Sequence, residues 1–368
     1  MRIFVLGTRG FPNVQGGVEK HCEELFPRIA SLGYEVIVCN RTPYISKENR
    51  HDEINGIKYI QLWCPKIKSL EAIIHTFLGI IIARFKSIDI LHIQGIGPAL
   101  LTPFARVLGI KVVITHHGSD YKRQKWGIIA KKILKLGEYL GLKYANKTIV
   151  ITKIIEEELG KKYGKIDSIV IPNGISTKEF ESNDEILGKY NLTKNKYFFT
   201  ACRFVPEKGL HDLIEAFEKY NGTEYKFVIA GDSDHDDNYS KSIKEIARKN
   251  NVILTGQIYG YELKELFINA GLFVLPSYHE GLPIALLEAM SYNLPVLVSN
   301  IPPHIDLELN PIRYFKTGDV NDLRNKMITL IELGIDDKEK EEYQYKIKNY
   351  YNWDIIAEKT IEVYNSIL

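Results

Sequence analysis

Short runs of apolar, β-branched residues alternate with longer amphipathic segments along the whole chain. In the first half the runs are continuously apolar, which is typical of strands whose two sheet faces are both covered by helices. They fall at residues 2–7, 35–40, 57–63, 90–95, 111–116, 148–152 and 168–172. The segments between them are long enough for crossover helices, so the first half predicts a parallel, doubly wound α/β domain.

The same pattern starts again after a polar stretch at residues 182–196. Its apolar runs fall at residues 197–203, 225–231, 251–256, 272–277 and 295–300. Helical periodicity separates them, as in residues 209–220 and in residues 283–292, where a proline occupies the first turn. We therefore expect two facing Rossmann-like domains. Ligands of open α/β sheets bind beyond the carboxyl ends of the strands, so we expect the function in a cleft between the domains.

Composition agrees with a folded intracellular protein. Of 368 residues, 45% are hydrophobic and 26% are charged, which excludes long disorder, collagen-like repeats and disulfide scaffolds. Four cysteines without a CxxC pair indicate neither a zinc site nor a disulfide framework, and we expect a reducing, cytoplasmic location. The beginning of the sequence lacks the pattern of a signal peptide. Residues 73–85 are apolar but too short to span a bilayer, and predict a core or interfacial helix.

The charge is divided unevenly between the two halves. Residues 1–180 carry 27 Lys and Arg against 16 Asp and Glu, and residues 181–368 carry 21 against 30. Because only one half is basic, duplex nucleic acid is not an expected partner, whereas an anionic surface or ligand is compatible with this polarity. A chance distribution of solvated faces is the alternative.

Residues 121–147 combine eight basic residues with a helical apolar stripe and a single internal acid, Glu138. The stripe recurs at spacings of three and four residues: Trp126, Ile129, Ile133, Leu136, Leu140 and Tyr144. Two interpretations stay open. The stripe faces a core with lysines in water, or the helix lies at an anionic membrane surface near a lipid-linked acceptor.

The strongest chemical motif lies where the run 272–277 ends and a helix begins. It contains two carboxylates, Glu280 before the helix and Glu288 inside it. Glu288 could accept hydrogen bonds from a vicinal diol such as a ribose. The helix N-terminus beside Glu280 offers free backbone donors and a positive dipole end, which suit a phosphate.

A second motif follows the first strand of the second domain. Arg203 and Lys208 flank a turn at that strand's carboxyl end, where a bidentate donor and a point charge together could neutralise a diphosphate. Taken alone, each would more often be a solvated cation.

These segments together resemble the retaining family 4 glycosyltransferases of the GT-B fold. The resemblance rests on EGLPIALLEAM with Glu280 and Glu288, ACRFVPEKG with Arg203 and Lys208, the segment 172–175, and the Gly16-Gly17 turn, and it spans nearly the whole chain. The opening segments 7–12 and 16–19, with THHGSDYKRQKWG at 115–127, are similar to a bacterial subgroup that includes rhamnosyltransferases of surface-polysaccharide assembly.

The resemblance implies a role for each motif residue of the second domain. Arg203 and Lys208 would hold the diphosphate, Glu288 the ribose hydroxyls and Glu280 the hydroxyls of the donated sugar. Backbone amides of Gly281, Leu282 and Ile284 would lie near sugar and phosphate. Many relatives have glycine where this chain has Pro283, which lacks an amide hydrogen and leaves the sugar preference open.

In the first domain, Gly16 and Gly17 would let bare backbone approach the donor phosphate. The family's Thr-x-His-Gly pattern aligns with His117 instead of His116, so His117 would contact the transferred sugar or orient the acceptor. Arg9, Asp120 and Lys122 are candidate acceptor-side residues. The domains implied are residues 1–172, with a C-terminal helix at about 351–368 packing back on them, and residues 173–350.

An acidic cluster of Asp232, Asp234, Asp236 and Asp237 around His235 resembles the manganese motif of other glycosyltransferases. We interpret it as a solvated loop, because Arg203 and Lys208 already offer the positive charge that a metal would supply. No cofactor and no metal are therefore expected.

The resulting hypothesis is a hexosyltransferase that moves a sugar, such as rhamnose or a related hexose, from a nucleoside-diphosphate sugar to a saccharide or lipid-linked acceptor in cell-surface polysaccharide biosynthesis. It would be cytoplasmic and peripheral at the inner face of the membrane. A sugar-nucleotide epimerase or phosphorylase of the same fold, and a noncatalytic nucleotide-sugar-binding partner, are the alternatives.

Overall fold

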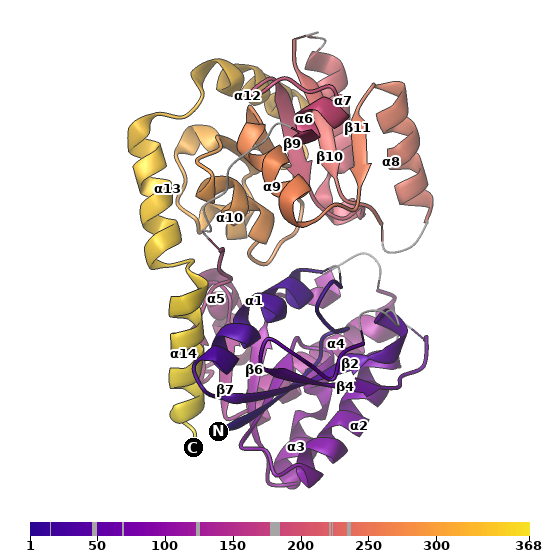
Figure 1. Ribbon diagram of the computed structural model, residues 1–368, viewed down its shortest axis with the longest axis vertical. Coiled ribbons are helices and arrows are strands. Elements are labelled where there is room, and N and C mark those ends of the chain that lie inside the picture. The colour runs from indigo at the N-terminus through magenta and orange to yellow at the C-terminus, as the bar shows by residue number, and fades with distance from the viewer. Residues whose placement is uncertain are drawn as a thin grey trace. The chain divides into compact units, whose positions relative to one another are not determined.

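A computed structural model describes residues 1–14, 16–45, 50–67, 70–122, 126–176, 185–220, 222, 224–233 and 237–368. The chain divides into two compact units. Unit 1 comprises Met1–Gly174 and Tyr351–Leu368, and unit 2 comprises Ile175–Tyr350. Each unit is built around a sheet with helices packed on it (Figure 1).

The sheet of unit 1 has eight strands in the order β3-β4-β2-β1-β5-β6-β7-β8. All neighbours are parallel except β3, which pairs antiparallel with β4. The strands are β1 (Arg2–Leu6), β2 (Glu35–Arg41), β3 (Glu53–Ile54), β4 (Ile57–Leu62), β5 (Ile90–Gln94), β6 (Lys111–His116), β7 (Lys147–Val150) and β8 (Ser168–Val170). The seven predicted strands are present. β3 was not predicted, although Asn55 and Gly56, both at positive φ, form a two-residue hairpin turn whose residue pair is a known signal.

Helices cover both faces of this sheet. They are α1 (Gly17–Ser31), α2 (Glu71–Phe85), α3 (Thr102–Val107), α4 (Ile128–Tyr144), α5 (Lys153–Tyr163) and α14 (Trp353–Asn365), with the short turns η1 (Thr42–Tyr44), η2 (Pro98–Leu101) and η3 (Asp120–Lys122). One buried cluster lies under α2 and α3 and the other under α1 and α14. None of the helices in the described ranges is long and apolar enough to cross a membrane.

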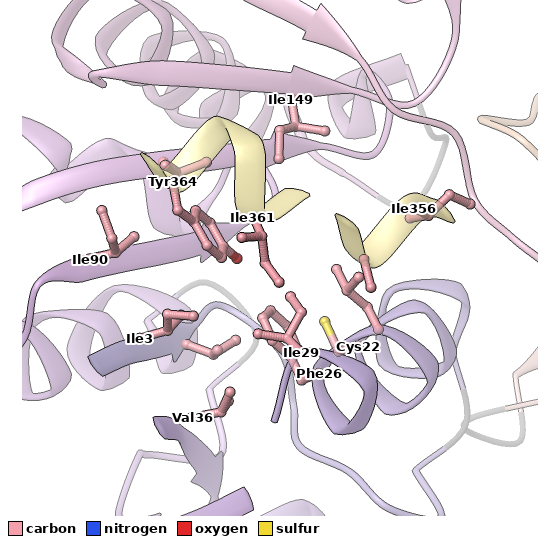
Figure 2. Packing of buried hydrophobic residues seen from close by; sticks show 14 of the residues in the cluster. Ile3, Cys22, Phe26, Ile29, Val36, Ile90, Ile149, Ile356, Ile361 and Tyr364 are labelled. Atoms are coloured by element: carbon pink, nitrogen blue, oxygen red, sulfur yellow. The ribbon is translucent and has the colours of Figure 1, made fainter. Parts of the chain in front are cut away.

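The last helix, α14, completes the core of unit 1. Figure 2 shows Phe26 of α1 and Tyr364 of α14 in one buried cluster. The Tyr364 hydroxyl lies 2.6 Å from Nδ1 of His92 on β5. Gly174, where the chain leaves unit 1, touches Trp353 so closely that a Cβ there would lie 2.7 Å from the indole ring. A helix far away in sequence is therefore part of this fold.

Unit 2 contains a six-stranded, fully parallel sheet in the order β11-β10-β9-β12-β13-β14. The strands are β9 (Tyr197–Ala201), β10 (Lys226–Ala230), β11 (Ile253–Gly256), β12 (Leu272–Leu275), β13 (Val296–Ser299) and β14 (Tyr314–Phe315). The five predicted strands are present, and the two-residue β14 is too short to leave an apolar run. Both units are thus doubly wound α/β folds, which confirms the predicted fold class.

Helices of unit 2 pack on its sheet around a phenylalanine-rich core. They are α6 (Glu185–Lys189), α7 (Leu210–Tyr220), α8 (Asn238–Lys249), α9 (Gly260–Asn269), α10 (Ile284–Ser291), α11 (Pro302–Ile305), α12 (Val320–Leu333) and α13 (Asp337–Asn349), with turns η4 (Pro206–Lys208) and η5 (Pro311–Arg313).

Candidate functional site

The two strongest sequence motifs follow neighbouring strands of unit 2. β9 pairs with β10 on one side and with β12 on the other, so the connections that leave β9 and β12 diverge from a topological switch point. Residues 202–209 continue from β9, and residues 276–283 continue from β12. Arg203, Lys208 and Glu280 therefore lie on two loops that start side by side at the sheet's carboxyl edge, where ligands of such sheets bind.

Lys208 and Glu280 meet directly. Lys208 Nζ donates to Oε1 of Glu280 at 2.5 Å, and the side chains are only 19% and 9% exposed. Ser277 Oγ donates to the same oxygen at 2.7 Å. Burial alone would raise the pKa of Glu280, but the Lys208 charge and the hydrogen bonds from Lys208 and Ser277 bring that pKa below its ordinary value. Glu280 is therefore a carboxylate, and within the described residues no group donates to its second oxygen, Oε2.

Two further contacts tie the two loops together, and a third ties the second loop to helix α7. Gly209 has φ 64°, and a Cβ there would lie 2.2 Å from the carbonyl oxygen of Pro276, so only glycine fits. The Tyr278 amide donates to the Glu207 carbonyl at 2.8 Å. The Tyr278 hydroxyl donates to Oδ2 of Asp212 on α7 at 2.5 Å. These contacts fix the separation of the loops before any ligand arrives.

Helix α10 begins directly after the second loop. Its N-cap is Pro283, and Gly281 and Leu282 lead into the first turn. The first amide groups of a helix have no partner within the helix, so the start at Ile284 can donate to an anion. Glu288 is half-buried on the same helix. Together with half-buried Arg203, the edge of this sheet combines cations, the amide groups of a helix start and carboxylates.

In unit 1, Gly16 and Gly17 lie between β1 and α1, as the sequence predicted. Gly16 has φ 153°, and a Cβ there would lie 2.0 Å from Oε2 of Glu19. Gly17 is exposed with open space around it. Glu19 is buried and accepts from the Arg9 backbone amide at 3.0 Å and from Arg9 Nε at 3.3 Å. Arg9, a candidate acceptor residue, thus holds the loop in place through Glu19.

The two adjacent histidines have different environments. His116 is buried; its Nδ1 accepts from the Gly118 amide at 3.2 Å, so the proton is on Nε2, which donates to Glu138 at 3.0 Å. His117 is half-buried, and its Nε2 lies 2.8 Å from Oε1 of Gln94. His116 is therefore part of the interior, whereas His117 is the histidine with access to solvent.

Glu138 is the centre of a buried polar cluster that the sequence did not predict. Its side chain is fully buried, and five groups contact its two oxygens at 2.5 to 3.4 Å: His116, Ser119, Tyr121, Lys162 and Tyr163. Burial alone would raise the pKa of Glu138, but these hydrogen bonds lower it to about 2. A lone acid inside a basic helical segment was the available signal.

The remaining acceptor candidates lie on the turn η3 after β6. Lys122 is exposed and forms an ion pair with Glu158 at 2.7 Å. Asp120 is half-buried, and its amide donates to the Gly118 carbonyl at 3.0 Å. The structure thus places Asp120 and Lys122 on a turn that follows shortly after His117.

Half of the apolar stripe expected on the segment 121–147 is solvent-exposed. Helix α4 begins at Ile128, and it buries Gly137, Glu138 and Gly141 instead. A Cβ at Gly137 would lie 2.3 Å from the Ile96 carbonyl, so this glycine face lets α4 approach the connection between β5 and η2. Several apolar side chains of α4 are between 40% and 77% exposed: Ile128, Ile129, Leu136, Tyr139 and Tyr144. The core-facing interpretation is therefore wrong for Ile129, Leu136 and Tyr144, whereas Trp126, Ile133 and Leu140 are half-buried.

The acidic cluster lies only partly within the described residues, because Asp234, His235 and Asp236 fall outside them. Asp232 pairs with Lys244 at 2.9 Å, and Asp237 caps helix α8 by accepting from the Ser240 amide at 2.8 Å. In the part of the chain that the structure describes, no three His, Cys, Asp or Glu side chains form a metal-binding group.

Comparison with known proteins agrees with the two-unit fold. Residues 15–179 match the family Glycosyltransferase Family 4, and residues 182–351 match the family Glycosyl transferases group 1. Among solved structures, sucrose-phosphate synthase from Thermosynechococcus elongatus superposes with a TM-score of 0.82 at 19% identity over 100% of this chain and 98% of that chain. Anabaena HepE in complex with UDP-glucose superposes with a TM-score of 0.80 at 16% identity over 100% of both chains.

Curated relatives of this chain bear glycosyltransferase names. A Bacillus subtilis protein named as a glycosyltransferase of teichuronic acid biosynthesis, TuaC, is 30% identical over 52% of this chain, which spans only 47% of that relative. An uncharacterised glycosyltransferase of Methanocaldococcus jannaschii is 27% identical over 99% of this chain and 98% of its own length. The chain belongs to the GT-B glycosyltransferases in which a Family 4 domain precedes a group 1 domain.

Proposed function

We propose that this glycosyltransferase moves a hexose from a nucleoside-diphosphate sugar to an acceptor hydroxyl with retention at the anomeric carbon. The observation that carries the proposal is the buried Lys208–Glu280 pair at the switch point of unit 2. A cation for phosphate and a carboxylate for hydroxyls lie 2.5 Å apart, as a ligand that joins a diphosphate to a sugar requires.

The donor would be held from both ends. Arg203 and Lys208 would bind the diphosphate, with the Gly281, Leu282 and Ile284 amide groups at the start of α10 beside it. Glu288 would accept hydrogen bonds from the ribose diol. Because the lowered pKa keeps Glu280 ionised, its Oε2 would accept hydrogen bonds from the donated sugar.

The main barrier to transfer is charge separation, as an oxocarbenium-like sugar leaves the diphosphate. Arg203, Lys208 and the α10 N-terminus would stabilise the developing negative charge in a partly buried environment, where such interactions are stronger than in water. We assign no covalent nucleophile, so front-face substitution, assisted by the leaving phosphate, is the expected route to retention. The two cations would also make a divalent metal unnecessary.

The proposal gives unit 1 the groups that orient the reacting hydroxyls. His117 would hydrogen-bond the transferred sugar or the acceptor, and Gly16 and Gly17 would admit the donor phosphate to bare backbone. Asp120 and Lys122, on the turn that follows His117, would contact the acceptor. Arg9 would act there through the loop that its contact with Glu19 holds.

For the acceptor we propose a growing cell-surface polysaccharide, with rhamnose or a related hexose as the donated sugar. Relatives named for teichuronic acid biosynthesis, for capsular polysaccharide biosynthesis and as an O-antigen mannosyltransferase support this class. The relatives named as phosphatidylinositol N-acetylglucosaminyltransferase subunits support a lipid-linked acceptor as well.

The exposed face of α4 supports attachment to the cytoplasmic membrane surface. Its apolar side chains, Ile128, Ile129 and Leu136, are accompanied by exposed Lys132 and Lys135. Such a mixed face suits the boundary of an anionic membrane. Flotation with anionic but not neutral liposomes is expected, with reduced flotation of Lys132→Glu/Lys135→Glu; equal behaviour with both lipid types would contradict this surface.

The proposed activity is tested by a donor panel. Thermal shift and product analysis with UDP-, dTDP-, GDP- and CDP-sugars should select one donor, because a ligand at 100 times its Kd adds about 2.7 kcal/mol of stability. Slow donor hydrolysis without acceptor and transfer with saccharide acceptors are expected. Release of a sugar phosphate that requires free phosphate would instead identify a phosphorylase, and binding of a donor without turnover would contradict transfer.

A further inference from the structure

Three buried polar side chains behind Glu280 form a connected series of hydrogen bonds. Nδ1 of His304, on α11, lies 2.8 Å from the carbonyl oxygen of Ser299 at the end of β13. Ser299 Oγ donates to the Ser277 carbonyl at 2.5 Å. Ser277 Oγ donates to Glu280 Oε1 at 2.7 Å. Since His304, Ser299 and Ser277 are each 0% exposed, this series runs through the interior to the site.

The direction of each hydrogen bond follows from the partners. A carbonyl oxygen only accepts, so Nδ1 of His304 must carry the proton that it shares with Ser299. The Ser299 hydroxyl gives its proton to the Ser277 carbonyl, and its oxygen can then accept from Nδ1, which lies 3.2 Å away. The Ser277 hydroxyl gives its proton to the Glu280 carboxylate. Every donor therefore points toward Glu280 along the series.

In the protein interior, His304 is energetically less favourable than an apolar residue would be. Its Nε2 is buried and has no hydrogen-bond partner among the residues with described positions. A buried polar atom without a partner is unfavourable, so packing alone would favour a side chain such as leucine. Burial lowers the pKa of His304 to about 4, so the ring stays neutral near pH 7. A neutral ring can donate to Ser299 without adding a charge beside Lys208.

We propose that Ser277, Ser299 and His304 are positioning residues that fix the Glu280 carboxylate for the sugar. Ser277 and Lys208 both contact Oε1, which orients the carboxylate and leaves Oε2 for a hydroxyl of the donor. Ser299 and His304 in turn fix the segment that carries Ser277. The inference rests on the proposed function of Glu280, because it names what sets that residue's geometry.

The experiment compares the affinity for a sugar nucleotide with the affinity for its nucleoside diphosphate, measured by calorimetry without acceptor. The probes are UDP-glucose and UDP, replaced by the pair that the donor panel selects. In Ser277→Ala the affinity for the sugar nucleotide should fall about tenfold, while the affinity for the diphosphate should stay within about twofold. A purely structural role would lower both together.

His304 provides the matched pair of variants. His304→Asn keeps a side-chain donor and should retain most of the preference for the sugar nucleotide, whereas His304→Leu should lose it to the same extent as Ser277→Ala. In a Glu280→Ala background, Ser277→Ala should have no further effect on either affinity, because the serine acts through the carboxylate. Thermal unfolding of each variant identifies those that do not fold. If the His304 variants do not fold, the comparison of Ser277→Ala with the wild type decides whether the positioning role holds.

Failure of this inference differs from failure of the proposed function. If the wild-type protein binds the sugar nucleotide and the diphosphate with equal affinity, Glu280 does not bind the sugar. The proposed site and this positioning role are then both wrong. If the wild type prefers the sugar nucleotide and Ser277→Ala keeps the full preference, only the positioning role falls.

Discussion

Two carboxylates, one in each unit, are held in contrasting ways, although Glu138 is buried and Glu280 is largely buried. Glu138 in unit 1 is contacted by five donors that occupy both of its oxygens. Glu280 in unit 2 is contacted by Lys208 and Ser277 at one oxygen only. A carboxylate whose hydrogen-bonding capacity is filled by its own protein stabilises the fold. One with an oxygen left over can accept a ligand, and burial by itself distinguishes neither role.

The units also differ in their buried histidines. In unit 1, burial lowers the pKa of His21 to about 4 and the pKa values of His75 and His92 to about 3. Among the described residues of unit 2, the buried histidine is His304, whose pKa burial lowers to about 4. A histidine whose pKa is lower in the folded protein than in the unfolded chain, where it is about 6.5, contributes its full stability above pH 6.5. This stability is lost as the pH falls toward the folded pKa. The stability that the Glu138 hydrogen bonds contribute is lost only below about pH 4.5.

As the pH is lowered, unit 1 should therefore unfold before unit 2. This is the largest effect we expect. At pH 5 each such histidine costs about 2 kcal/mol, so unit 1 loses about 6 kcal/mol and unit 2 about 2. All three tryptophans, Trp63, Trp126 and Trp353, belong to unit 1. Tryptophan fluorescence should report unfolding at a higher pH than the last loss of far-UV circular dichroism. Coincident transitions would contradict independent acid stability of the units.

The two carboxylates can be compared directly by substitution. Glu138→Gln removes a charge that Lys162 and its other donors need, and should lower the free energy of unfolding by about 3 to 5 kcal/mol. Glu280→Gln breaks only the pair with Lys208, so it should lower the free energy of unfolding by a smaller amount, about 1 to 2 kcal/mol, but reduce kcat/KM for transfer about 100-fold. Thermal unfolding and steady-state kinetics on both variants check this. A stability loss in Glu280→Gln as large as in Glu138→Gln would remove the distinction.

Arg203→Ala sharpens the assignment of unit 2 to the diphosphate. Loss of this cation should reduce turnover by about 100- to 1000-fold, equivalent to about 3 to 4 kcal/mol of transition-state stabilisation, with the fold intact. Arg248→Ala, an exposed arginine on α8 of the same unit, is the matched control and should behave as wild type. Near-normal turnover in Arg203→Ala would refute its role.

The smallest expected effect is that of metal removal. Because Arg203 and Lys208 supply positive charge to the leaving diphosphate, transfer should persist in EDTA at a rate within about twofold of the untreated enzyme. Abolition by the chelator with rescue by Mn²⁺ would overturn the assignment and return attention to the acidic segment 232–237.

The sequence predicted the strands well because buried parallel strands are continuous apolar runs, a local property. It missed β3 and β14, which have two residues each. It also left open whether the apolar stripe of α4 faces a core or a membrane surface, because periodicity shows that a stripe exists but not what covers it. Gly137 and Gly141, which form the buried face, add almost nothing to an apolar pattern.

For the site, residue type and spacing were enough to single out Lys208 and Glu280, but not their contact across 72 positions of the chain. Ser277 is the last residue of the apolar run 272–277, for which the pattern predicts no chemical role, and His304 lies outside every motif. Their connection to Glu280 depends on β12 and β13 being neighbours in the sheet, which a local pattern does not encode.

The position of α14 has a consequence for how the protein folds during synthesis. Its Trp353, Ile356 and Tyr364 fill the same cluster as Phe26 and Ile90, yet the ribosome makes them after the whole of unit 2. The hydrophobic cluster of unit 1 can therefore be completed only after the last helix has been made, although most of unit 1 is translated before unit 2.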